Sequence, residues 1–135
     1  MEELVLAAQE AREKAYVPYS NFKVGAAVLA KGGQVYTGCN VENASYGLCN
    51  CAERTAIFKA VSEGESELVA IAIIADTKDP VAPCGACRQV MAEFGITKII
   101  MSNLHGQQYT ATLEELLPYS FTASSIKKHL SGEIL

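Results

Sequence analysis

The sequence lacks several features that would place it in common classes of protein. It has no long run of lysine or arginine and a net charge of -4, so it offers no basic footprint for nucleic acid. No apolar stretch reaches the ~20 residues of a membrane span, and the acidic N-terminus, Met1 to Leu4, lacks the features of a signal peptide. Internal repeats, low-complexity tracts and linkers are also absent. We therefore expect a cytoplasmic protein with a small-molecule partner, and neither a nucleic acid nor a membrane as partner.

The composition predicts a single folded domain over residues 1–135. The length of 135 residues is a common domain size, and half of the residues are hydrophobic, which is ample for a core. Charged residues make up 19% of the chain, below the usual level of about 25%, which favours some surface being buried between subunits. Five cysteines in a cytoplasmic chain favour metal binding or catalysis over disulfides.

The hydrophobic pattern predicts an α/β fold. The expected helices cover residues 3–16, 51–62, 83–94 and 113–117, and the expected strands cover 22–30, 34–41, 68–75, 98–102 and 108–112. The run from Leu68 to Ala75 has no polar alternation, which is typical of a strand covered on both faces. This order predicts a three-layer α-β-α sandwich with a mixed five-stranded sheet. Ligands in such folds bind at the carboxyl ends of strands, where helices begin.

Two segments at predicted helix starts contain four of the cysteines. They are Cys49-Asn50-Cys51-Ala52-Glu53-Arg54 and Pro83-Cys84-Gly85-Ala86-Cys87-Arg88-Gln89. A helix N-terminus lowers the cost of a thiolate, and sulfurs three residues apart on a first turn can reach one metal ion. A redox pair is an alternative for the second segment, but it leaves the other cysteines unexplained. Four sulfurs also leave open a closed structural zinc site that uses Cys49 as a fourth ligand.

Glu53 favours the open form of the zinc site. It follows Cys51 by two residues, so it shares the first helical turn and its carboxylate could reach a water in the fourth zinc position. Metal-activated hydrolysis needs such a carboxylate to move protons without binding the metal. Together, Cys51-Ala52-Glu53 and Pro83-Cys84-Gly85-Ala86-Cys87 match the signature of zinc-dependent nucleobase deaminases.

Over nearly its whole length the chain resembles the small homotetrameric cytidine deaminases that use three zinc cysteines. The resemblance is carried by the motifs at residues 18–26, 38–46, 51–54 and 83–89. It implies one Zn²⁺ per subunit on Cys51, Cys84 and Cys87, with Glu53 as the catalytic proton carrier. It also implies a homotetramer in which neighbouring subunits complete each site.

The resemblance assigns substrate contacts as well. Phe22 packs beside the pyrimidine or sugar, Asn40 and Glu42 bind ribose hydroxyls, and the Ala52 N–H meets the base carbonyl. Ala44, Tyr46 and Phe121 lie near a subunit boundary, where Tyr46 and Phe121 reach a neighbour's site. We add Arg54 from charge balance, because three thiolates leave one Zn²⁺ with a net charge of about -1 and a guanidinium can donate to sulfur.

The expected activity is hydrolytic deamination of cytidine and deoxycytidine to uridine and deoxyuridine, a reaction of pyrimidine salvage. A deaminase of a related cytosine nucleoside analogue is an alternative, since Asn40 and Glu42 favour a ribose but do not prove it. The alternative outside enzymes is a structural zinc module with four cysteine ligands.

Overall fold

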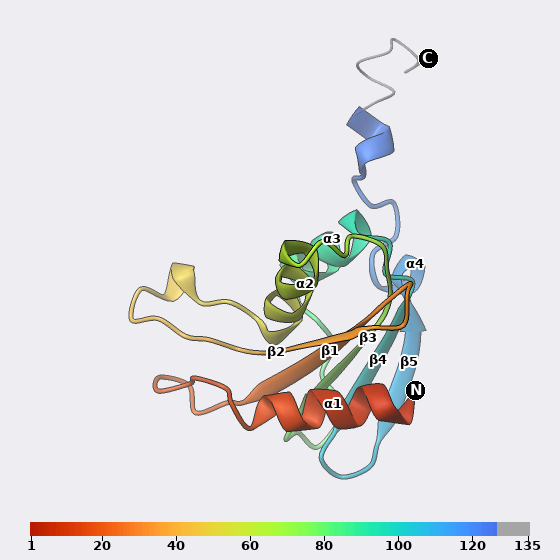
Figure 1. Ribbon diagram of the computed structural model, residues 1–135. Coiled ribbons are helices and arrows are strands. Elements are labelled where there is room, and N and C mark those ends of the chain that lie inside the picture. Colours follow the sequence, from red (N-terminus) through yellow and green to blue (C-terminus); the bar gives the residue numbers. More distant parts are fainter. Residues whose placement is uncertain (127–135) are drawn as a thin grey trace.

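The computed structural model describes residues 1–126 of the chain (Figure 1). Residues 127–135, which the predicted single domain includes, lie outside the described residues. The helices are α1 (Glu2–Arg12), α2 (Ala52–Ser62), α3 (Gly85–Glu93) and α4 (Leu113–Leu116), with a short 3₁₀ helix over Tyr46–Leu48. The strands are β1 (Val24–Ala30), β2 (Val35–Cys39), β3 (Leu68–Ala75), β4 (Lys98–Asn103) and β5 (Gln108–Thr112).

The five strands form one mixed sheet in the order β2-β1-β3-β4-β5. Strands β3 and β4 are parallel, and the other three pairs are antiparallel. The β1–β2 hairpin turns at Gly33, whose φ of +99° is the left-handed conformation that glycine tolerates. The predicted mixed five-stranded sheet is therefore confirmed.

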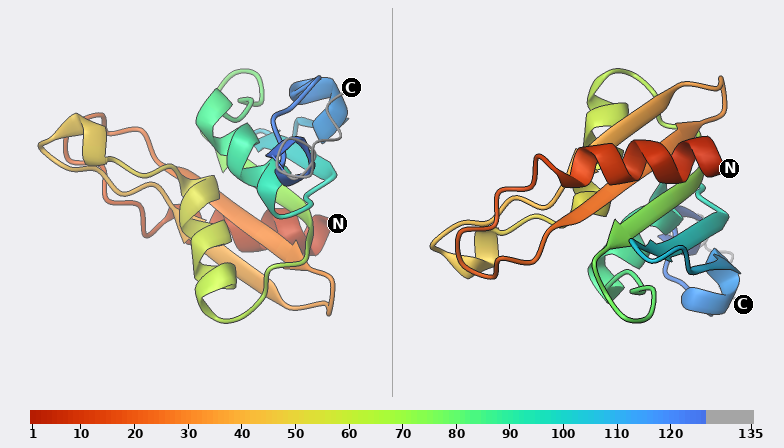
Figure 2. Two further views of the ribbon diagram at one scale, coloured as in Figure 1. Left: turned by 90° about the horizontal axis from the view of Figure 1, so that it is seen from above. Right: turned by 90° about the horizontal axis from the view of Figure 1, so that it is seen from below.

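Helices cover both faces of the sheet. Helix α1 lies on one face, and helices α2 and α3 lie side by side on the other (Figures 1 and 2). Strand β3 is apolar throughout because both of its faces are covered. Ile71 and Ile73 pack with α2 and α3, whereas Ala72 and Ile74 pack with α1. The predicted three-layer sandwich is confirmed. None of the helices within residues 1–126 has the length and apolar character needed to cross a membrane.

Several element boundaries differ from the predictions. Helix α1 ends at Arg12 rather than at residue 16, because Tyr16 leaves the helix to bridge Val41 and donates its N–H to the Asn40 carbonyl at 3.0 Å. Strand β1 begins at Val24, two residues later than predicted. The 3₁₀ turn at residues 46–48 was not predicted.

A glycine on β2 allows helix α2 to lie directly against the sheet. A Cβ atom at Gly38 would lie 2.5 Å from the Ala56 nitrogen and 2.9 Å from the Ala52 oxygen, which is too close for any side chain. The first two turns of α2 therefore rest on bare strand backbone. This contact matters for function because Cys51 and Glu53 belong to the start of that helix.

Candidate active site

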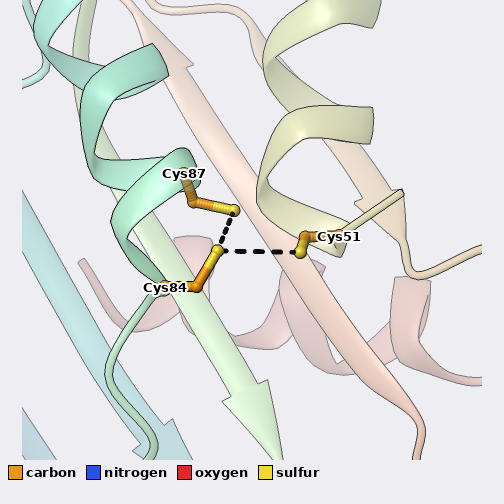
Figure 3. A group of neighbouring side chains, drawn as sticks. All are labelled: Cys51, Cys84 and Cys87. Carbon is orange, nitrogen blue, oxygen red and sulfur yellow. Dashed lines mark hydrogen bonds between the residues drawn. The ribbon is translucent and has the colours of Figure 1, made fainter. Parts of the chain in front are cut away.

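Three cysteine sulfurs come together where helices α2 and α3 begin. Cys51 is the N-cap residue of α2, Cys84 is the N-cap residue of α3, and Cys87 lies in the first turn of α3. The Cys51 and Cys84 sulfurs are 4.0 Å apart, the Cys84 and Cys87 sulfurs are 3.5 Å apart, and all three lie within 4.8 Å of one another (Figure 3). The predicted set of metal-binding cysteines thus forms one cluster able to hold a metal ion.

The donor set and its spacing fit zinc. Tetrahedral Zn²⁺ with Zn–S bonds of about 2.3 Å requires sulfurs about 3.8 Å apart, which is near the observed separations. Cys49 does not join this cluster, because its sulfur accepts from the Asn43 N–H at 3.3 Å and lies 3.6 Å from the Asn43 carbonyl oxygen. Three sulfur ligands leave one zinc position open, which is the arrangement of catalytic rather than structural sites.

The cluster favours a thiolate at Cys51. Hydrogen bonding from Cys87 and then from Arg54 lowers the pKa of Cys51 to about 5, against the opposing effect of burial. The same bond to Cys51, together with burial, raises the pKa of Cys87. Metal binding requires all three thiols to lose their protons, so occupancy couples to proton release.

Arg54, which was predicted to balance the charge of the thiolates, lies beside the cluster. Its Nη2 donates to the Cys51 sulfur at 3.2 Å, and this bond raises the pKa of Arg54 above its usual range. Its buried Nε has no hydrogen-bond partner among residues 1–126. A guanidinium at this distance can offset part of the negative charge of three thiolates.

Glu53 lies at the bottom of a cleft next to the sulfurs. Its side chain is only 6% exposed, and burial raises the pKa of its carboxyl group to about 7. The cleft has a volume of about 370 Å³ and is lined by Glu53, Cys51 and Cys84, and also by Phe22 and Asn40. A carboxyl group that titrates near neutrality is suited to accept and return protons at physiological pH.

The cleft also brings together residues that are far apart in the sequence. Asn40 accepts from the Val24 N–H at 2.9 Å and donates to the Phe22 carbonyl at 2.8 Å, so its amide is held in a defined orientation. Phe22 is 41% exposed, and Ala52, which carries the first backbone N–H of α2, lines the same cleft. Size alone does not locate the site, because a larger cavity of about 560 Å³ beside β5 and α4 contains none of the predicted residues.

Glu42 and Tyr46 line a separate hollow of about 230 Å³, together with Tyr19, Ser20 and Cys49. The Glu42 carboxylate accepts from the Tyr19 N–H at 3.0 Å and the Ser20 N–H at 3.1 Å, and it also bonds the Ser20 hydroxyl. The Ser20 hydroxyl chiefly lowers the pKa of Glu42. Within one subunit, this carboxylate therefore organises the loop that precedes Phe22.

The residues predicted at a subunit boundary are exposed in the isolated chain. Tyr46 is 73% exposed and contacts only the edge of the Tyr19 ring among the aromatic rings of residues 1–126, with centroids 5.9 Å apart. Ala44 is exposed on the same loop, which projects from the sheet (Figure 2). Phe121 is 61% exposed, and its carbonyl accepts from Gln89 of α3 at 2.7 Å.

The structure adds residues that the sequence patterns did not indicate. The segment of residues 76–84, here called the β3–α3 loop, connects β3 to α3, and its Val81 and Ala82 form part of the cleft wall. Ile73 of β3 also lines the cleft. These side chains are apolar and lie in no motif with a chemical signature, so no signal in the single sequence separates them from core residues.

Comparisons with known proteins identify the family of this chain. The family model described as "Cytidine and deoxycytidylate deaminase zinc-binding region" matches residues 1–103. A cytidine deaminase of Halalkalibacterium halodurans is 61% identical over 91% of this chain and 95% of its own length. That of Sporosarcina psychrophila is 52% identical over 93% and 94% of the two chains.

A solved structure gives the same result in three dimensions. The crystal structure of cytidine deaminase from Burkholderia pseudomallei matches with a TM-score of 0.86 and 54% identity, over 89% of this chain and 98% of that one. The likeness thus extends over the fold, the two helix starts and most of the sequence. The chain belongs to the cytidine and deoxycytidylate deaminase family of zinc-binding proteins.

Proposed function

We propose that this protein hydrolyses the 4-amino group of cytidine and deoxycytidine, giving uridine or deoxyuridine and ammonia. The observation that carries this proposal is a cluster of three cysteine sulfurs, two of which line the same cleft as the buried Glu53 carboxyl group. Relatives with 52% and 61% identity that are named cytidine deaminase support the same substrate class. The reaction serves pyrimidine salvage in the cytoplasm.

The metal ligands are Cys51, Cys84 and Cys87, which would hold one Zn²⁺ per subunit. Zinc bound to such a site lowers the pKa of water from 15.7 toward about 7 and so supplies a nucleophile at neutral pH. Arg54 donates to the Cys51 sulfur, and its positive charge offsets the net negative charge of three thiolates on one Zn²⁺. The N-termini of α2 and α3, where the cysteines lie, add partial positive charge.

Glu53 moves the protons of the reaction. Its carboxylate accepts the first proton of the attacking water and delivers it to ring N3, while the water oxygen bonds to C4 and makes that carbon tetrahedral. Glu53 then takes the second proton from the new C4 hydroxyl and passes it to the amino group, so that the C4–N bond breaks, ammonia leaves and C4 becomes a carbonyl. Burial of Glu53 and its pKa of about 7 support this role, because the group can hold and release a proton at working pH.

The remaining contacts orient the nucleoside. Phe22 offers an aromatic face beside the pyrimidine or sugar, Asn40 offers an amide to a ribose hydroxyl, and the Ala52 N–H donates to the base carbonyl. Glu42 binds a ribose hydroxyl in this proposal and also holds the loop at Tyr19 and Ser20. The support is that Phe22, Asn40 and Ala52 line one cleft with Glu53.

The working form is a homotetramer in which neighbouring subunits complete each site. Support comes from large apolar side chains that a monomer leaves in water: Tyr46, Leu48, Tyr119 and Phe121 are each 61% exposed or more. In this arrangement Ala44 and Tyr46 lie at the boundary, and Phe121 covers the base in an adjacent subunit's pocket. Sedimentation of the purified protein tests the oligomeric state. The activity of a Phe121→Ala variant, compared with that of the unmodified protein, tests whether Phe121 completes a neighbouring site.

The function is tested by following the loss of cytidine absorbance in the ultraviolet. We expect zinc-dependent turnover of cytidine and deoxycytidine that a chelator abolishes and added zinc restores. Side-by-side assays of free cytosine and a cytosine nucleoside analogue separate the proposed substrates from the related ones. Absence of turnover by a zinc-loaded protein would overturn the proposal, and preferred turnover of the analogue would move it to the alternative substrate.

A further inference from the structure

The β3–α3 loop delivers a metal ligand without any regular secondary structure of its own. Its nine residues, 76–84, follow the last residue of β3 and end on Cys84, the N-cap residue of α3. Val81 and Ala82 of the same loop form part of the cleft wall. The Cys84 carbonyl accepts from the Arg88 N–H at the start of α3, but within the described part of the chain no ladder or helix bond satisfies the backbone of residues 76–83. Side chains that reach this part of the loop therefore help to fix its position.

Two side chains outside the loop hydrogen-bond to its carbonyl groups among residues 1–126. Arg88 of α3 donates to the Pro83 carbonyl at 2.8 Å, next to Cys84. Asn103, the last residue of β4, donates to the carbonyls of Thr77 and Lys78 at 2.9 and 3.1 Å. The loop carbonyls are thus held near both ends, once from α3 and once from β4, and the exposed His105 side chain also contacts the Asp76 carboxylate at 3.0 Å.

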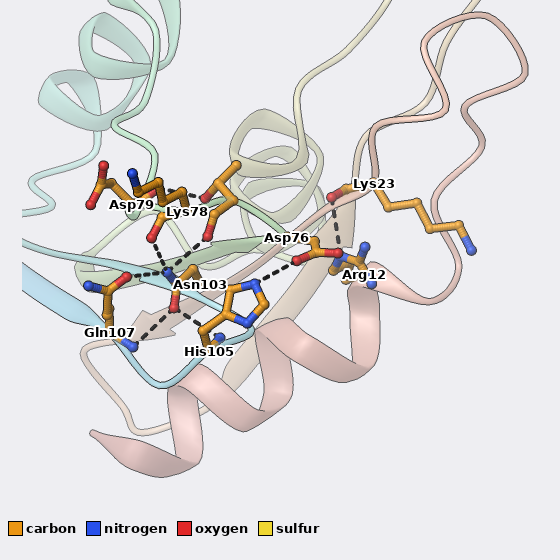
Figure 4. Close-up of polar contacts among 9 residues, drawn as sticks. Arg12, Lys23, Asp76, Lys78, Asp79, Asn103, His105 and Gln107 are labelled. Atoms are coloured by element: carbon orange, nitrogen blue, oxygen red, sulfur yellow. Dashed lines mark hydrogen bonds and ion pairs between the residues drawn. The ribbon is translucent and has the colours of Figure 1, made fainter.

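The Asn103 carboxamide is itself fully engaged and almost fully buried. Asn103 is 3% exposed, and its two N–H groups are shared among three acceptors, the Thr77 and Lys78 carbonyls and the Gln107 side-chain oxygen at 2.7 Å. Its oxygen accepts from the backbone N–H groups of His105 and Gln107, each at 3.0 Å. Figure 4 shows it between the β3–α3 loop and the turn that follows β4. A buried amide with both ends satisfied has one low-energy orientation, so it fixes the two segments relative to each other.

We propose that Asn103 is a positioning residue for the zinc centre: it holds the β3–α3 loop so that Cys84 and the cleft wall keep their places. In the sheet, Asn103 lies opposite Ala75, so its side chain meets the loop just where the chain leaves β3. No metal or substrate contact is assigned to it. The inference rests on the zinc centre proposed above and extends it to a residue that no motif in the sequence singles out.

The test compares Asn103→Asp with Ser102→Ala. Aspartate keeps the shape and the acceptor, but it cannot donate to the Thr77 and Lys78 carbonyls. Ser102 is the matched control because it is also buried, at 2% exposure, and also donates to a carbonyl of the β3 chain, that of Ile73, at 2.8 Å within the sheet. Both changes remove side-chain donation at the end of β4: Ser102→Ala loses one bond within the sheet, whereas Asn103→Asp loses the bonds to Thr77, Lys78 and Gln107. Only Asn103→Asp releases the loop.

Two measurements distinguish a positioning role from general loss of stability. The first is the rate at which zinc passes from the folded protein to a chromogenic chelator, which we expect Asn103→Asp to raise roughly tenfold and Ser102→Ala to leave within twofold. The second is amide hydrogen exchange, which should accelerate in residues 76–84 of Asn103→Asp alone. Each variant is measured at the same number of degrees below its own melting temperature, which removes the effect of global unfolding.

The inference is overturned if the two variants release zinc at the same rate, or if loop exchange in Asn103→Asp matches that of the unmodified protein. If Asn103→Asp does not fold, Asn103→Ser, which is too short to reach both carbonyls, takes its place in both measurements. A wild-type protein that retains no zinc would refute the proposed function instead. The exchange comparison does not need the metal, so it decides the role of Asn103 in that case as well.

Discussion

Replacing Arg54 by alanine should weaken zinc binding while leaving the fold intact. The change removes the donation from Nη2 to the Cys51 sulfur at 3.2 Å and the positive charge beside the cluster. Hydrogen bonds to charged groups contribute about 1.5–3 kcal/mol. Cys51 is only half-buried, so solvent screening reduces this by about half, to roughly 0.8–1.5 kcal/mol. Since about 1.4 kcal/mol is tenfold, zinc affinity should fall roughly four- to twelvefold.

The assay is competition with a chelator of known affinity, alongside kcat and KM for cytidine. Arg54→Lys separates charge from geometry, because lysine keeps the charge but presents a compact ammonium rather than a planar fork. We expect zinc affinity between those of wild type and Arg54→Ala. Lys59→Ala is the matched control, since it removes a positive charge from the exposed last turn of the same helix. Unchanged zinc affinity and kinetics in Arg54→Ala would refute the reasoning.

Three further changes test other parts of the site. Glu53→Gln should keep zinc but lower kcat by about 10²–10⁴, the usual contribution of a general acid–base; full activity would remove Glu53 from the mechanism. Cys51→Ala should lose zinc and Cys49→Ala should retain it, as measured by metal content, and the opposite pattern would restore the closed four-cysteine site. Gly38→Ala should lower the free energy of unfolding by about 1–3 kcal/mol through overpacking against α2, and lower zinc content too. Gly47→Ala, where an added Cβ meets nothing within 4 Å, should leave the melting temperature and zinc content unchanged.

Much of the fold was predictable because its signals are local. The apolar run of β3 indicates a strand covered on both faces, and the glycines after α2 and α3 indicate helix ends. Neither signal requires knowledge of distant residues. Boundaries failed where a distant segment competes, as at Tyr16, whose bond to the Asn40 carbonyl replaces the last turn predicted for α1. The helical periodicity of the sequence cannot show that Tyr16 will instead adopt an extended conformation and bond to Asn40, 24 residues further along the chain.

The sequence by itself determined the chemistry of the centre. Two cysteines three residues apart at a helix start predict soft metal ligands. A carboxylate two residues after another cysteine predicts a proton carrier nearby, and both patterns are local. They left open whether Cys49 would join them. That choice needed the tertiary structure, in which the Cys49 sulfur lies against Asn43 and away from the cluster.

Only the tertiary structure decided what surrounds that chemistry. The pairing of β3 with β4 brings Asn103 to the β3–α3 loop, and the bare backbone at Gly38 sets the depth at which α2 lies. It also buried Glu53, which raises the pKa of that carboxyl group to about 7. These effects depend on distances between segments that the chain brings together only when the sheet forms. Residue types and spacing therefore define the reactive groups, whereas sheet register and helix packing define their positions and proton affinities.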